Sequence, residues 1–238
     1  MFLDETGHEG MPQGHAYYGM SGCAVMAADY ERLIARPWRD FRRLVTGNPD
    51  APLHAFNFGR AATPERLEAC GRFFRDNGFM RIGSVAATTT QIPRDQSYKQ
   101  DFSAIPEAEH LAWMVLRALH NRILVIAKWT PFRSVAIVVE RNPRSKRLLQ
   151  SAFADLGFEE DGKPVPVDLY EMDKKAAEPG LEVADFVANA IAGHARHTLV
   201  GGKEGCRRDF QAIFQSVDPK LASFLAITGV EVTPAQRA

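Results

Sequence analysis

Acidic side chains occur at three places where secondary structure would direct them toward a common point. Asp4 ends the first expected strand, Glu140 ends a later buried strand, and Glu182 and Asp185 lie one turn apart on a late helix. Residues three or four apart share one face of a helix, so the last two form a polar stripe. Carboxylate oxygens are preferred ligands of Mg²⁺ and Mn²⁺. The spacing therefore predicts a divalent-metal site.

A site of this kind suits phosphodiester hydrolysis. Two cations about 3.5–4 Å apart stabilise both the attacking and the leaving oxygen of a phosphoryl group. We expect Asp4, Glu140 and Asp185 to be the metal ligands. Glu5 and Glu182 are expected to act as auxiliary ligands or as bases that orient water. Strand alternation points Asp4 and Glu5 to opposite faces, which makes Asp4 the better ligand of the two.

Each acid also has a plain structural interpretation when it is taken alone. The opening pair fits a loop at a strand end, and Glu140 fits an ion pair with Arg141. The two helical acids fit the capping of backbone amides or ion pairs with later basic residues. The order along the chain favours the metal site, because acids end the first and fourth expected strands and then occupy the last core helix.

A run of basic residues follows Glu140 and lies at an expected helix N-terminus. Lys and Arg side chains bind phosphates without reading sequence, and the amides of a helix N-terminus also favour anions. The run therefore predicts nucleic-acid contacts, although a solvated charged face explains it equally well. Its members are Arg141, Arg144, Lys146 and Arg147.

Composition indicates one large globular domain. The chain has 238 residues, of which 45% are hydrophobic and 24% charged, enough to form one substantial core. Lys and Arg together number 29, as do Asp and Glu, so any binding of a polyanion must be local. The three cysteines are scattered without metal-ligand spacing, which argues against a disulfide framework and against a zinc site.

Other classes of protein lose support from missing motifs. The sequence has no Walker phosphate loop, no dinucleotide-binding glycine motif after a strand, and no nucleophile-elbow motif of serine hydrolases. No apolar run approaches the roughly 20 residues that cross a bilayer, and acid follows Met1 too early for a signal peptide. A cytoplasmic protein without a membrane partner is the expectation.

The expected elements alternate as in an α/β domain. Expected strands cover residues 1–4, 17–26, 80–90, 134–139 and 164–170. Expected helices cover residues 30–44, 63–77, 106–126, 142–153 and 180–197, with two short ones near 207–217 and 220–226. Because the later strands need helical crossovers, this order predicts a mixed sheet with helices on both faces. We expect a single domain over residues 1–238, with a helical insertion at about 28–78 between strands two and three and a C-terminal helical extension at about 198–238.

Four short motifs follow one another along residues 2 to 191. The chain opens with Asp4-Glu5-Thr6-Gly7, continues with Leu53-His54-Ala55 and with a strand over 136–140 that ends in an acid, and closes with Leu181-Glu182-Val183-Ala184-Asp185. Together they resemble the bacterial domain-of-unknown-function family numbered thirty-eight hundred, whose members open with Asp-Glu-Ser-Gly and close with a Leu-Gln-x-Ala-Asp helix.

The resemblance implies a ribonuclease H-like fold, an α/β fold whose five-stranded mixed sheet has three antiparallel strands followed by two parallel ones. By fold analogy it implies a metal-dependent nuclease with Mg²⁺ or Mn²⁺ as cofactor and nucleic acid, DNA or RNA, as partner. Asp4 and Glu5 match the opening pair, Glu140 the central acid and Asp185 the helical acid. His54 matches the mid-chain histidine and is a candidate nucleic-acid contact, with a packing role as the alternative.

Three positions depart from the family pattern. Thr6 stands where Ser is usual and keeps the hydroxyl group. Glu140 stands where Asp is common, which lengthens the side chain by one methylene. Glu182 stands where Gln is common, so it is either an added ligand or an acidic substitute for a hydrogen-bonding amide.

Two functions fit these features. The first is a Mg²⁺- or Mn²⁺-dependent nuclease that hydrolyses phosphodiester bonds at the acidic cluster. The second is a non-catalytic ribonuclease H-like module that binds nucleic acid or a protein partner, which the balanced charge and the Glu substitutions favour. Oligomeric state is open as well, because Trp38 and Phe41 suit either a homodimer face or the core.

Overall fold

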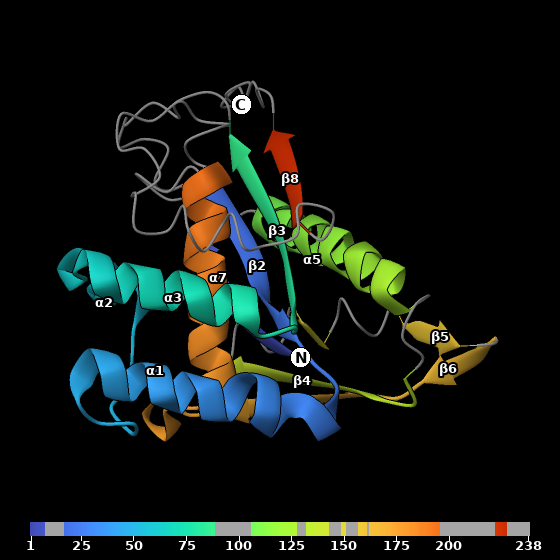
Figure 1. Cartoon of the computed structure of the whole chain (residues 1–238). Coiled ribbons are helices and arrows are strands. Elements are labelled where there is room, and N and C mark those ends of the chain that lie inside the picture. The colour runs from blue at the N-terminus through green and yellow to red at the C-terminus, as the bar shows by residue number, and fades with distance from the viewer. Residues whose placement is uncertain are drawn as a thin grey trace, which may run out of the picture.

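The computed structural model of the chain is built around one mixed β-sheet (Figure 1). It describes residues 1–7, 17–88, 106–127, 132–142, 149–150, 157–160, 162–195 and 222–227. Within them, the strands of this sheet are β1 (Phe2–Gly7), β2 (Tyr17–Ala24), β3 (Met80–Thr88), β4 (Val135–Glu140), β7 (Val167–Met172) and β8 (Ala222–Ile227). Their order across the sheet is β7-β4-β1-β2-β3-β8.

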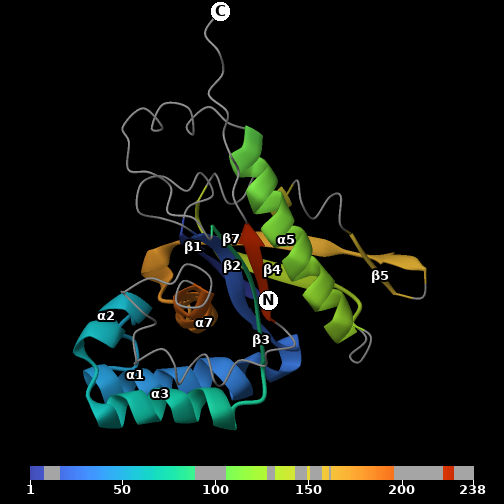
Figure 2. The same cartoon turned by 90° about the horizontal axis from the view of Figure 1, so that it is seen from above.

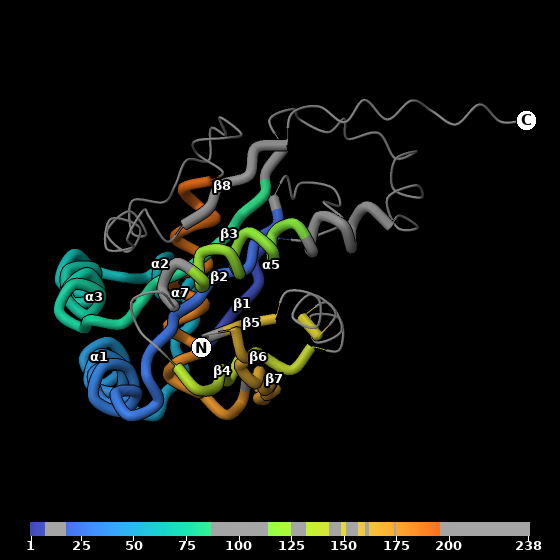
Figure 3. Tube along the Cα trace, turned by 90° about the vertical axis from the view of Figure 1, so that its right-hand side faces the viewer, coloured from blue at the N-terminus to red at the C-terminus, as the bar shows by residue number. Residues whose placement is uncertain are grey.

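The directions of the strands follow from how they are connected. The strands β1, β2 and β3 are antiparallel neighbours. The strands β4 and β7 extend the sheet from β1 as parallel strands, at the opposite end from β3 (Figure 3). Parallel pairing requires a long crossover, which the chain between β3 and β4 provides with a helix. The predicted mixed sheet, with three antiparallel strands and then two parallel ones, is confirmed.

The sixth strand corrects a prediction. Residues 220–226 were expected to form a short helix, but Ala222–Ile227 form β8, which pairs in parallel with β3. The segment has six residues, of which Ser223 is the polar one, and periodicity cannot separate a strand from a helix in so short a run. Its parallel pairing with β3 gives the strand its hydrogen-bonding partner. The rest of the predicted C-terminal helical extension lies outside the described residues.

Helices cover both faces of the sheet, as predicted. The helix α5 (Pro106–Ala127) packs on one face, and α7 (Pro179–Ala195) packs on the other. Outside α7 lies a layer formed between β2 and β3 by α1 (Arg36–Thr46), α2 (Ala55–Ala61) and α3 (Pro64–Asp76) (Figure 2). No helix in the described part of the chain is long and apolar enough to span a bilayer.

Shorter elements complete the described structure. A separate hairpin pairs β5 (Phe158–Glu160) with β6 (Lys163–Val165). A π-helical turn over Glu31–Ala35 leads into α1, and 3-10 turns occupy Ala27–Asp29 and Lys174–Ala176. Of the helix predicted over 142–153, only residues 149–150 are described as helical.

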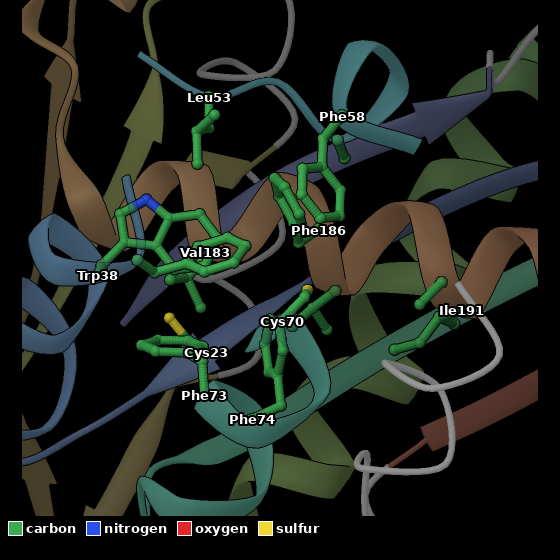
Figure 4. Close-up of a cluster of buried hydrophobic side chains, with 14 of the residues drawn as sticks. Cys23, Trp38, Leu53, Phe58, Cys70, Phe73, Phe74, Val183, Phe186 and Ile191 are labelled. Atoms are coloured by element: carbon green, nitrogen blue, oxygen red, sulfur yellow. The ribbon is translucent and has the colours of Figure 1, made fainter. Parts of the chain in front are cut away.

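An aromatic core joins α7 to the helical layer (Figure 4). The Trp38 ring centroid lies 4.8 Å from that of Phe73 and 5.0 Å from that of Phe186. Phe41 contacts the same rings, and both Trp38 and Phe41 are buried. The core is therefore the role that the structure gives to these two side chains. A second apolar cluster, which includes Leu3 and Leu119, lies between the sheet and α5.

Gly180 allows α7 to approach β1 closely. A Cβ atom at this position would lie 2.5 Å from atoms of the Phe2 ring, which is far inside van der Waals contact. Glycine is thus required for the first turn of α7 to rest on the opening strand. This contact sets the position of the acidic residues that follow in the helix.

Candidate functional site

The first two acids of the site come from neighbouring parallel strands. In the register of β1 and β4, Phe2 pairs with Val138 and Leu3 pairs with Val139. Continuing the register by one residue places Glu140 beside Asp4. Adjacent strands lie about 4.8 Å apart, so Asp4 within β1 and Glu140 at the end of β4 are side by side. The expectation that the first strand ends at Asp4 is wrong, because β1 continues to Gly7 in its pairing with β2.

The helix α7 brings the third acid to the same place. Phe2 faces α7, and Asp4 shares that face because side chains alternate along a strand. Burial, followed by the negative charges of Asp185 and Glu140, raises the pKa of Asp4 from its ordinary 3.8 to about 8. The backbone amide of Glu5, which donates to Asp4 Oδ1 at 3.0 Å, acts in the opposite direction. Asp185 and Glu140 therefore each lie within electrostatic reach of Asp4.

Asp185 also holds the start of α2. Its Oδ2 accepts a hydrogen bond from the backbone amide of Ala55 at 2.7 Å and lies 3.1 Å from Nδ1 of His54. Its Oδ1 accepts a hydrogen bond from Asn189 Nδ2 at 3.3 Å. The His54 side chain is 41% exposed, whereas that of Asp185 is 15% exposed. His54 thus stands at the solvent-facing rim of the acidic cluster.

Glu182 does not join that cluster. Its Oε2 accepts hydrogen bonds from Trp38 Nε1 at 2.7 Å and from Arg42 Nε at 2.8 Å, and its Oε1 accepts one from the amide of Leu53 at 3.0 Å. Burial raises the pKa of its carboxyl group, and the hydrogen bonds from Arg42 and Trp38 act against that rise. The structure gives Glu182 contacts to α1 and to the segment before α2, rather than the expected place beside the candidate metal ligands.

Glu5 faces a small cleft at the ends of β1 and β4. Its Oε1 accepts a hydrogen bond from Asn142 Nδ2 at 2.9 Å. The cleft has a volume of about 250 Å³, and both Asp4 and Glu140 contribute to its lining. Apolar side chains, among them Leu3 and Val139, also line it. Glu5 is therefore adjacent to Asp4 but oriented by a different partner.

The predicted nucleic-acid contacts are described only in part. Arg141 pairs with Asp173 at 3.2 Å, and both side chains are 61% exposed. The other members of the basic run, Arg144, Lys146 and Arg147, lie outside the described residues. The expectation that these residues bind phosphates stays a prediction.

The donor set suits a hard cation, because it consists of carboxylate oxygens. As the side chains lie, however, no group of three or more His, Cys, Asp and Glu residues in the described segments is arranged to hold a metal ion. The hydrogen bonds of Asp185 are one reason for the absence of such a group, because both of its carboxylate oxygens already accept one. Coordination of Mg²⁺ or Mn²⁺ by Asp4, Glu140 and Asp185 stays a prediction.

Sequence reasoning missed two features beside the cluster. Trp38 and Arg42 lie one turn apart on the buried face of α1, which was a visible signal for a buried partner acid. Ser21 lies directly opposite Asp4 in the antiparallel pairing of β1 and β2. Its side chain is fully buried, and its Oγ has no hydrogen-bond partner in the structure. Only the strand register reveals Ser21, because its type and spacing carry no signal.

Comparisons of this chain with protein-family models, with curated proteins and with solved structures find no match.

Proposed function

We propose that this chain is a Mg²⁺- or Mn²⁺-dependent phosphodiesterase that hydrolyses nucleic acid and has a ribonuclease H-like fold. The observation that carries the proposal is the meeting of three acids from separate elements. Continuing the parallel register of β1 and β4 by one residue places Glu140 beside Asp4, and the negative charge of Asp185 on α7 acts on Asp4. The strand order, with three antiparallel strands and then two parallel ones, supports the fold.

The electrostatics around Asp4 favour a cation close to the three acids. Neighbouring carboxylates repel one another when all are ionised, and this repulsion contributes to the raised pKa of Asp4. A divalent cation bound there would polarise a phosphoryl oxygen and lower the pKa of water. Asp4, Glu140 and Asp185 would hold it, and Glu5, fixed by Asn142, would orient water in the adjoining cleft.

The proposal predicts that amide substitutions at two of the acids abolish cleavage. Asp4→Asn and Asp185→Asn keep the size of each side chain but remove a charged ligand. Labelled single- and double-stranded DNA and RNA are incubated with each purified protein and Mg²⁺ or Mn²⁺. Asp40→Asn is the control, because Asp40 is exposed and pairs with Arg43 on α1. Circular dichroism verifies folding, and cleavage by either site variant at the rate of the parent would contradict the assignment.

A second function, a non-catalytic module that binds nucleic acid or a protein partner, has one observation in its favour. Both oxygens of Asp185 are already engaged by Ala55, His54 and Asn189. A carboxylate used in this way holds α2 in place without any cation. Calorimetry with millimolar Mn²⁺ separates the two functions: the nuclease binds the ion, whereas the module binds labelled nucleic acid or a partner without it.

A further inference from the structure

We propose that the hydroxyl group of Ser21 is a positioning group for Asp4, to whose carboxylate it donates a hydrogen bond when the acid serves as a metal ligand. This inference rests on the proposed function and names a further residue of the same site. It is carried by strand register, by burial, and by a hydroxyl group without a hydrogen-bond partner in the described part of the chain.

The register places the two side chains next to each other. Asp4 and Ser21 are directly paired residues of the antiparallel strands β1 and β2. Directly opposite side chains project from the same face, with Cβ atoms about 4.5–5.5 Å apart. Ser21 therefore stands under α7 on the side of the sheet that carries the acidic cluster.

The Ser21 hydroxyl group is available to Asp4. The residue is fully buried, and its Oγ has no hydrogen-bond partner in the structure. A buried hydroxyl group without a partner is unfavourable, so such a group calls for an explanation. The carboxylate of Asp4, directly opposite Ser21 in the strand pairing, is the acceptor that the geometry offers.

Asp4 has a matching place for this donor. Within the described residues, its hydrogen bond comes from the amide of Glu5 and goes to Oδ1, which leaves Oδ2 without one. Carboxylates that bind metals are normally held by such outer hydrogen bonds, which fix their orientation. Ser21 supplies the donor from the neighbouring strand.

Gly83 makes room for the hydroxyl group to turn. It pairs with Ser21 from β3, and a Cβ atom there would lie 2.5 Å from Ser21 Oγ and 2.4 Å from Ile191 Cδ1. The hydroxyl group thus occupies the space that a side chain at position 83 would fill. Rotation about χ1 to another staggered position would turn it away from Gly83, and the proposal places it toward Asp4 on β1.

Ser84 offers a matched control on the other face of the sheet. It is also fully buried, and among the described side chains its Oγ also has no hydrogen-bond partner. Its paired residue is Met20, which belongs to the apolar cluster under α5. Ser84→Ala therefore removes a buried hydroxyl group from the same sheet, as Ser21→Ala does, but the hydroxyl group that it removes is not next to an acid of the site.

The experiment measures Mn²⁺ affinity by calorimetry on the full chain. Ser21→Ala is expected to weaken binding about 10–100-fold, the usual effect of losing an outer-shell partner, while Ser84→Ala binds like the parent. Thermal unfolding without metal should change equally little in both variants. Ser21→Cys fills the space with a much weaker donor and is expected to bind nearly as weakly as Ser21→Ala, which preserves the test if the alanine variant does not fold.

Two different failures are distinguishable. If the parent binds Mn²⁺ and both Ser21 variants bind it equally well, the positioning role of Ser21 is wrong and the nuclease proposal stands. If the parent binds no Mn²⁺, the proposed function fails and the role of Ser21 fails with it. Equal weakening by Ser84→Ala would also overturn the inference, because the effect would then come from sheet stability.

Discussion

Asp4 is the residue on which charge, burial and register converge. It lies within β1, where it is paired with Ser21 of β2, and continuing the register of β1 and β4 by one residue places it beside Glu140. Burial and the charges of Asp185 and Glu140 raise its pKa to about 8. The stability of the fold therefore depends on pH, because Asp4 in the unfolded chain has its ordinary pKa near 3.8.

The raised pKa of Asp4 predicts a loss of stability as pH rises. Between about pH 4 and 8 the folded chain retains a proton on Asp4 that the unfolded chain has released, so the free energy of unfolding falls across this window. Asp4→Asn cannot ionise and still accepts the Glu5 amide. Without metal, it should be more stable than the parent at pH 8.5 by on the order of a few kcal/mol, with little difference near pH 4.

Urea unfolding at the two pH values, with chelator present, measures this difference. Asp40→Asn serves as the control, because its exposed side chain lies on α1; it should follow the profile of the parent. If the free energy of unfolding of the parent, relative to that of Asp4→Asn, increased with pH, the assigned environment of Asp4 would be wrong. Added Mn²⁺ should reverse the order at pH 8.5, since a cation stabilises only the ionised parent.

At the scale of elements, α7 organises the site through two carboxylates one turn apart. Glu182 accepts the amide of Leu53, and Asp185 accepts the amide of Ala55. The pair therefore fixes both ends of a three-residue segment that carries His54. Arg42 strengthens this arrangement, because it also donates to the carbonyl groups of Ala177 and Pro49. The helical layer and the acidic cluster are thus one connected unit.

Removing the Glu182 carboxylate should destabilise the fold strongly. Glu182→Ala leaves the buried Arg42 guanidinium without its ion partner, and breaking a buried pair in this way costs about 3–5 kcal/mol. Glu31→Ala is the comparison, because Glu31 pairs with Arg39 at an exposed position where about 1 kcal/mol or less is expected. Urea unfolding measures both. Similar small losses for the two variants would show that the buried pair does not hold the layer to α7.

The elements also show what the sequence can and cannot disclose. The helix of α3 was predictable from Thr63, which caps the amide of Arg66, and from Pro64 in the first turn. The proximity of Asp4 and Glu140 was predictable because both lie on strands of one sheet, although β1 continues past Asp4 to Gly7. The partner of Glu182 was not, since Arg42 is far away in sequence and a polar stripe does not identify its contacts. The short run ASFLAI likewise could not identify β8 as a strand, because six residues do not distinguish a strand from a helix.

At the scale of the whole molecule, acidic and basic charges balance, whereas the proposed nuclease function requires attraction to a polyanion. Equal numbers of acidic and basic residues, 29 of each, give no overall field. Binding of nucleic acid would therefore depend on a local group of cations near the acidic cluster. The basic run after β4 is the predicted group, and Arg141 is its member with a described position, exposed beside Asp173.

This balance predicts a shallow dependence of nucleic-acid binding on salt. With four cations neutralising phosphates of a single strand, the slope of log affinity against log salt should be about −3, since each contact contributes about −0.7. Arg141→Ala should weaken binding and bring the slope to about −2. Arg32→Ala is the control, because Arg32 is an exposed side chain paired with Asp29 in the helical layer. Fluorescence anisotropy of a labelled oligonucleotide across a salt series measures each slope, and equal changes in both variants would indicate that phosphate binding is spread over the surface rather than placed beside β4.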